Sequence, residues 1–115
     1  MWKEIFDKLK EKNLNPFPPG QHKGECKEPY CVVKEGNQLP SIQSNRLGQR
    51  KIEIIVFVPI ASYISLDPYM KQISSALKEL LNLRKTGFET QAVTDDDKKA
   101  YTTSIEYTII KKLEG

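Results

Sequence analysis

The chain has 115 residues, of which 38% are hydrophobic and 29% are charged, a balance that is ordinary for a folded protein with one core. Its net charge of +3 lacks the strong basic excess of a dedicated nucleic-acid binder. No apolar run approaches the roughly 20 residues of a membrane span, and the charged start "MWKEIFDKLKEKN" has no apolar core of a signal peptide. We therefore expect one domain, residues 1–115, that stays in the cytoplasm where it is made.

The N-terminal segment predicts an amphipathic helix from Trp2 to Lys12. Its apolar residues recur at the i, i+3, i+4, i+7 spacing of one helix face, and charged residues fill the other positions. A helix this short is not stable alone, so it must pack on apolar surface. Pro16 prevents its continuation. The next stretch, 16–29, reads "PFPPGQHKGECKEP", and its four prolines and two glycines predict a long loop.

Two strands are predicted next, from Tyr30 to Glu35 and from Arg50 to Val58. The polar connection from Gly36 to Gln49 is expected to be the extended tip of the hairpin that joins them. The second strand alternates, with one apolar face and an opposite face that begins charged and becomes apolar, so one end is expected to be covered on both sides. The apolar face consists of Ile52, Ile54, Val56 and Val58.

A second helix is expected after the connection "IASYIS". Asp67 is a suitable N-cap and Pro68 suits the first helical position. The helix is predicted to end near Leu83, where "KTG" supplies cationic and glycine stop signals. Its buried stripe is predicted to be Met70, Ile73, Leu77, Leu80 and Leu81.

The C-terminal part predicts two more strands, from Phe88 to Thr94 and from Ala100 to Lys112, with a charged turn at 95–99. The last strand is expected to be half-buried, because apolar and polar residues alternate along it. One face carries Tyr101, Thr103, Ile105, Tyr107 and Ile109, and the other carries Thr102, Ser104, Glu106 and Thr108.

The element order α-β-β-α-β-β predicts an α+β fold. We expect a four-stranded, mainly antiparallel sheet with the two helices on one face. The 50–58 strand is the central candidate because it is the most apolar on both faces, and the second helix is expected to cover it.

Catalytic and metal-binding patterns are weak in this chain. His22, Cys26 and Cys31 form a Cys/His set of three, and Glu25 could complete a set of four zinc ligands. We interpret the cysteines as reduced thiols and His22 as a loop residue. A Cys–His catalytic pair is the alternative, although a Pro/Gly loop holds such geometry poorly. No catalytic residue, metal or cofactor is therefore expected.

A ferredoxin-like nucleic-acid-binding module is a second alternative, since such sheets bind bases on aromatic side chains. Tyr101 and Tyr107 share a strand face, but that face also carries the apolar residues expected to meet the helices. Arg46, Arg50 and Lys51 make only a small basic group. We interpret the tyrosines as core residues, and no specific nucleic acid is expected.

Taken in order, the chain resembles the tail terminator (tail completion) family of tailed phages of Gram-positive bacteria and of phage-tail-like bacteriocins. The resemblance covers nearly all 115 residues: a short helix, a Pro-rich approach to "EPYCVVKEG", a polar loop, "RKIEIIVFVP", "LDPYMKQISSALKELL" and a closing "YTTSIEYTIIKKL". Head–tail joining proteins have a similar pattern.

The resemblance implies an α+β structural protein without enzymatic activity. Such proteins form a hexameric ring on the last ring of the tail tube, end tail polymerisation and present the surface that the head-side connector joins. The implied partners are therefore further copies of the chain, the tail tube protein and the connector, with DNA passing through the ring. The implied location is a virion tail or tail-like particle, assembled in the cytoplasm of the bacterial host.

Interface residues are not supplied by the resemblance and are predicted from the residues themselves. The polar connection 36–49 carries apolar side chains that gain from meeting another surface, and arginines beside them suit acidic groups of a neighbouring subunit or of the tube protein. The predicted interface set is Leu39, Ile42, Arg46, Leu47 and Arg50. The alternative is that these apolar side chains fold back on their own domain. Singly exposed apolar residues are also common on protein surfaces.

Overall fold

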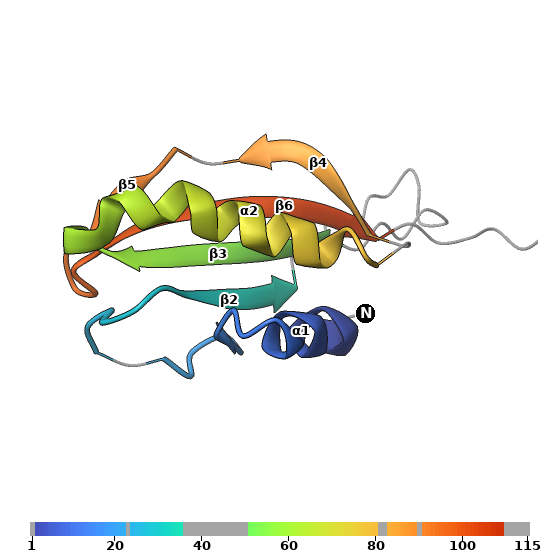
Figure 1. Ribbon diagram of the computed structural model, residues 1–115, viewed down its shortest axis with the longest axis horizontal. Helices are drawn as coiled ribbons and strands as arrows, with labels where there is room; N and C mark the ends of the chain where they lie inside the picture. The colour runs from blue at the N-terminus through green and yellow to red at the C-terminus, as the bar shows by residue number, and fades with distance from the viewer. Residues whose placement is uncertain (1, 23, 36–50, 81–82, 90, 110–115) are drawn as a thin grey trace, which may run out of the picture.

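The computed structural model describes residues 2–22, 24–35, 51–80, 83–89 and 91–109, and for 86–89 the backbone alone. Within these residues it shows an α+β arrangement of two α-helices and a six-stranded mixed sheet (Figure 1). The helices are α1 (Trp2–Glu11) and α2 (Leu66–Leu77), with the 3₁₀ segment η2 (Ile60–Ser65) before α2. The strands are β1 (Pro16–Phe17), β2 (Tyr30–Glu35), β3 (Lys51–Pro59), β4 (Leu83–Glu89), β5 (Val93–Asp95) and β6 (Ala100–Ile109).

The sheet has the order β1-β2-β3-β6-β4, and β5 also pairs with β6. The β1–β2 pair is parallel and the other pairs are antiparallel. The expected four-stranded sheet is thus too small by two short strands, while the central place of β3 is confirmed. The expected loop 16–29 begins with β1, because Pro16 and Phe17 pair with Cys31 and Val32.

The main core lies between the helices and one face of the sheet. The alternating face of β3 is buried there with Ile73 and Leu77 of α2, and Met70 and Leu80 pack against it, as the pattern predicted. The α1 residues Ile5 and Leu9 join the same core. The indole N–H of Trp2 also donates a hydrogen bond to the Val33 carbonyl oxygen at 2.7 Å, which ties α1 to β2.

Helix α2 is displaced from its expected bounds at both ends. It begins at Leu66, with Ser65 as N-cap and no side-chain capping bond, so Asp67 is not the cap. Pro68 is tolerated at the third helical position because the first amides of a helix have no intrahelical acceptor. The helix ends at Leu77, where hydrogen bonds of the Leu80 and Leu83 amides to the carbonyls of Leu77 and Leu80 turn the chain into β4.

The single strand expected at 88–94 is also wrong. Two separate strands, β4 and β5, lie along the same edge of β6, β4 beside its Ile109 end and β5 beside its Ala100 end. A register shift between Lys85 and Glu89 interrupts the first of them. The expected stop signal "KTG" therefore lies inside β4. No helix within the described part of the chain is long and apolar enough to cross a membrane.

Strand β6 follows the predicted alternation only in part. Thr103, Ile105 and Tyr107 are buried on the helix side, and Tyr101 is half-buried. On the opposite face Ser104 is buried as well, so this face is less exposed than the sequence predicted. The expected continuation of the strand to Lys112 lies outside the described residues.

Candidate interaction surface

The predicted interface set, Leu39, Ile42, Arg46, Leu47 and Arg50, lies outside the described residues. The strands that flank it are described, however. Glu35 pairs with Ile52, and Lys51 pairs with Thr108. Segment 36–50 therefore leaves and re-enters the sheet at one end, the end where β6 finishes.

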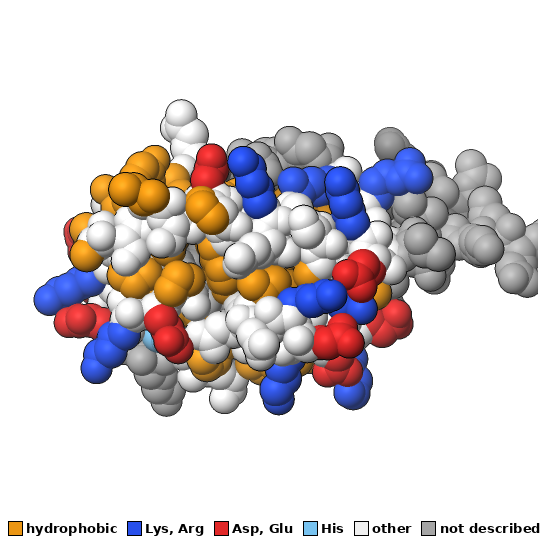
Figure 2. Space-filling view, viewed as in Figure 1, with side chains coloured by type: hydrophobic (Ala, Val, Ile, Leu, Met, Phe, Trp, Pro, Cys, Tyr) orange, Lys and Arg blue, Asp and Glu red, His pale blue; other side chains and the backbone are white. Residues whose placement is uncertain are grey.

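The opposite end of the sheet carries an exposed apolar surface. It consists of Ile60, Tyr63 and Ile64, residues that are 44%, 53% and 88% exposed, and is called the η2 patch below. The Tyr63 ring packs on Tyr101 of β6, with centroids 4.5 Å apart. The Ile60 amide donates to the Lys99 carbonyl oxygen at 3.2 Å, which fixes η2 against the β5–β6 turn. Figure 2 shows hydrophobic side chains gathered at this end of the molecule.

Acidic residues lie on the two segments that adjoin the η2 patch, the first turn of α2 and the β5–β6 turn. Asp67 is exposed in the first turn of α2, three residues after Ile64. The β5–β6 turn adds Asp96 and Asp97, both exposed, and Asp95 accepts a hydrogen bond from the Lys98 amide at 3.1 Å. The patch therefore combines apolar side chains with carboxylates, a composition that suits a partner with apolar and cationic groups.

Loop 16–29 folds over the face of the sheet that the helices leave uncovered. His22 stacks on Tyr30 with ring centroids 3.7 Å apart, and Tyr30 stacks on Phe57 at 4.7 Å. Phe17 meets both His22 and Tyr30 edge-on, at 5.0 and 5.5 Å. Aromatic pairs in these geometries stabilise beyond their buried area. The loop is thus held in place by a small second core.

The β5–β6 turn holds the same loop from its other side. Lys98 Nζ donates to the His22 carbonyl oxygen at 2.9 Å, and the Cys26 amide donates to the Lys98 carbonyl oxygen at 2.8 Å. Lys99 forms an exposed ion pair with Glu25 at 3.4 Å. The His22 ring has a buried Nδ1 without a hydrogen-bond partner among the described residues, and burial followed by the charge of Lys98 lowers its pKa.

The two cysteines are buried free thiols in different clusters, so the Cys/His set does not come together. Cys31 lies in the main core, whereas Cys26 packs beside Tyr30 in the second core. Burial raises the pKa of Cys26 to about 11 and that of Cys31 to about 12. Within the described ranges, no three His, Cys, Asp or Glu side chains are grouped as a metal site would require.

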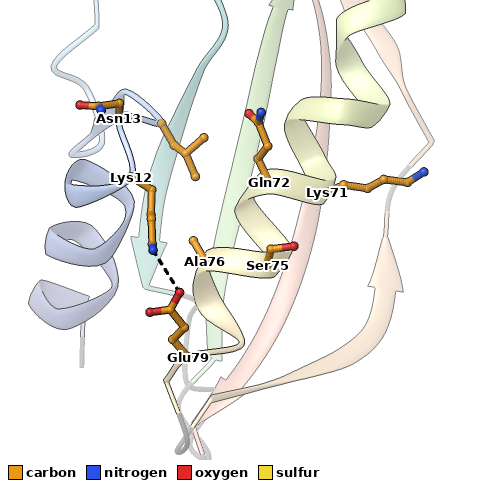
Figure 3. Close-up of a pocket in the computed structure, with 8 residues that line it drawn as sticks. Lys12, Asn13, Lys71, Gln72, Ser75, Ala76 and Glu79 are labelled. Carbon is orange, nitrogen blue, oxygen red and sulfur yellow. Dashed lines mark ion pairs between the residues drawn. The ribbon is translucent and has the colours of Figure 1, made fainter.

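A hollow lies between α1 and α2, lined mainly by polar side chains (Figure 3). Lys12 at the end of α1 forms an ion pair with Glu79 across it at 3.2 Å, and Lys8 forms another with Glu79 at 3.1 Å. Lys71 points away from the centre of the hollow. These exposed pairs join the two helices, and the arrangement contains no set of groups aimed at a common ligand.

No protein-family model matches the chain, and no curated protein matches it significantly. The η2 patch was missed at the level of the sequence, where "IASYIS" was interpreted only as a connection. Three large apolar residues within five positions were the available signal, but their exposure depends on how η2 lies on the sheet.

Proposed function

We propose that this chain is a structural subunit of a phage tail or tail-like particle, a tail terminator. It caps the tail tube, ends tail polymerisation and provides the surface that joins the head-side connector. It works as a homo-oligomeric ring, in the virion tail or tail-like particle assembled in the bacterial cytoplasm, and it carries out no catalysis.

The η2 patch is the observation that carries this proposal. A lone exposed apolar residue needs no explanation, but Ile64 is almost fully exposed beside two further large apolar side chains on an ordered 3₁₀ segment. Contiguous apolar surface bordered by polar groups is typical of a protein–protein contact. A ring subunit needs such a contact with each neighbour, and the resemblance of the whole chain supplies the kind of ring.

The chemistry of the two alternatives fits less well. Nucleic acid could stack on the exposed Tyr63 ring, but Asp96 and Asp97 near the same patch would repel phosphates. A thiol enzyme needs a cysteine with a lowered pKa, whereas burial raises the pKa of Cys26 to about 11. Both observations favour a protein partner over a nucleic acid or a thiol substrate.

The test is tail morphology with variants of the predicted interface set. Ile42→Asp or Arg46→Glu should leave the subunit folded, with little change in melting temperature, while tails become overlong or headless under the electron microscope. Lys71→Glu, a charge reversal on the exposed side of α2, is the matched control and should give normal tails. Normal tail length and normal head joining with both interface variants would remove segment 36–50 from the mechanism.

A further inference from the structure

We propose that the η2 patch is the receptor for segment 36–50 of a second copy of this chain. The inference rests on the proposed function and adds to it the two surfaces that meet between neighbouring subunits. The apolar side chains Leu39, Ile42 and Leu47 would cover Ile60, Tyr63 and Ile64. The arginines of the segment would pair with the carboxylates on the segments that adjoin the patch.

The strand ends that flank segment 36–50 and the η2 patch lie at opposite ends of the same sheet. Segment 36–50 enters β3 at Lys51, and η2 begins directly after β3 ends at Pro59. The strand has nine residues, and at a rise of about 3.3 Å per residue its ends are roughly 26 Å apart. The η2 patch begins beyond that distance.

The segment is too short to cover the patch of its own subunit. Ile42 follows Glu35 by seven residues, and a fully extended chain of that length spans at most about 25 Å. Leu39 and Leu47 are each four residues from the nearest strand, which allows about 14 Å. At full extension only Ile42 could approach the near edge of the patch, so the segment is too short for its three apolar side chains to cover the patch of their own subunit.

The C-terminal residues 110–115 cannot cover it either. They follow Ile109, which lies at the same end of the sheet as Lys51 because β6 runs antiparallel to β3. Six extended residues reach about 22 Å at most. The C-terminus thus does not reach the end of the sheet that carries the η2 patch, and the hairpin segment is too short to cover it.

The charges of the two surfaces are complementary. Segment 36–50 contains Arg46 and Arg50 and no acidic residue. Asp67 and the aspartates of the β5–β6 turn lie on the segments that adjoin the patch, whereas the two lysines of that turn are engaged with loop 16–29. Arginine and carboxylate form directional, charge-assisted pairs, which would set the register of the contact.

A contact between opposite ends is heterologous, since each subunit gives one surface and receives on the other. Such contacts form a closed ring when the rotations from each subunit to the next add up to a full turn. An isologous contact of two η2 patches would instead produce a dimer and leave segment 36–50 unused. The heterologous and the isologous arrangement predict different assemblies when two variants of the chain are mixed.

The direct test is binding of a fluorescent peptide of residues 36–50 to the full-length Ile42→Asp chain, whose own segment is impaired and leaves the patch vacant. We expect saturable binding by fluorescence anisotropy. Adding Ile64→Asp to the chain should weaken it by roughly tenfold or more, as expected for loss of an apolar anchor. Val93→Asp is the matched control: Val93 is 57% exposed but pairs with Thr102, so it faces the other side of the sheet, and binding should be unchanged. Equal binding with and without Ile64→Asp, or no binding at millimolar peptide, would overturn the proposal.

The second test mixes two full-length variants, Ile42→Asp and Ile64→Asp, and measures mass by light scattering. Each alone should be monomeric, and the mixture should form one-to-one dimers, because one intact contact remains between unlike subunits. A mixture that stays monomeric would overturn the heterologous contact. Peptide binding together with normal tails in the Ile64→Asp phage would refute the tail role and leave the contact standing. Absence of peptide binding together with overlong tails in the Ile42→Asp phage would refute the contact and leave the tail role standing.

Discussion

Truncation of one buried isoleucine tests the packing of α2 on the sheet. Ile73 is fully buried in the main core, and Ile73→Ala removes three carbon atoms from it. At about 0.8 kcal/mol per buried methylene the transfer loss is roughly 2.4 kcal/mol. The residual cavity increases this loss, and the higher helix propensity of alanine returns about 0.4 kcal/mol. We expect a net loss of about 3 kcal/mol in the free energy of unfolding.

Ile64→Ala is the matched control, since it removes the same atoms from a residue that is 88% exposed on the segment next to α2. It should change stability by less than about 0.5 kcal/mol. For a chain of this size, a loss of 3 kcal/mol lowers the melting temperature by roughly 12 °C. Urea unfolding followed by circular dichroism, at a concentration where the chain is monomeric, measures both variants. A loss below about 0.5 kcal/mol for Ile73→Ala, or equal losses for the two, would refute the assignment of the buried helix face.

Three further predictions concern the second core, the thiols and the attachment of α1. Because the folded-state pKa of His22 is lowered below the ordinary value of 6.5, its contribution to stability is complete above pH 6.5 and is lost as the pH falls through the folded pKa. His22→Phe, which preserves the ring stack, should therefore lose less stability on acidification than the wild type, and identical pH profiles by thermal melting would contradict this. Cys26 and Cys31 are buried with raised pKa values, so at pH 8 a thiol reagent should label the folded chain far more slowly than the unfolded chain. Rapid labelling of one thiol per folded chain would count against the described packing. Trp2→Phe removes the donor to the Val33 carbonyl and should cost about 1 kcal/mol in urea unfolding, and an unchanged stability would show that this bond does not hold α1.

Sequence periodicity alone determined the parts of the fold whose pattern is local. The alternation along β3 and the helical spacing in α1 and α2 identified the buried faces, because strand and helix geometry place every second residue, or every third and fourth, on one side. The α+β class followed, although the predicted order α-β-β-α-β-β missed β1 and the separate strand β5. The predicted interface set also came from the sequence, as apolar and arginine side chains in a polar connection, and it stays a prediction because those residues lie outside the described part.

Tertiary structure decided where a local pattern allows more than one outcome. Leu77, Leu80 and Leu83 have helical spacing, yet Leu83 begins β4 because it pairs with Ile109. The position of loop 16–29 likewise depends on a residue far away in the sequence. Lys98, 76 residues from His22, donates a hydrogen bond to the His22 carbonyl oxygen. No local pattern encodes such pairings.

The η2 patch belongs to the same class of feature. In the sequence, Ile60, Tyr63 and Ile64 are apolar residues that any core could bury. Only the path of η2, held by the Ile60 amide on Lys99 and by Tyr63 on Tyr101, turns the patch toward solvent. Exposure is a property of the assembled neighbours of a residue, so the sequence supplied the chemistry of this surface and the packing of η2 on the sheet made it available to a partner.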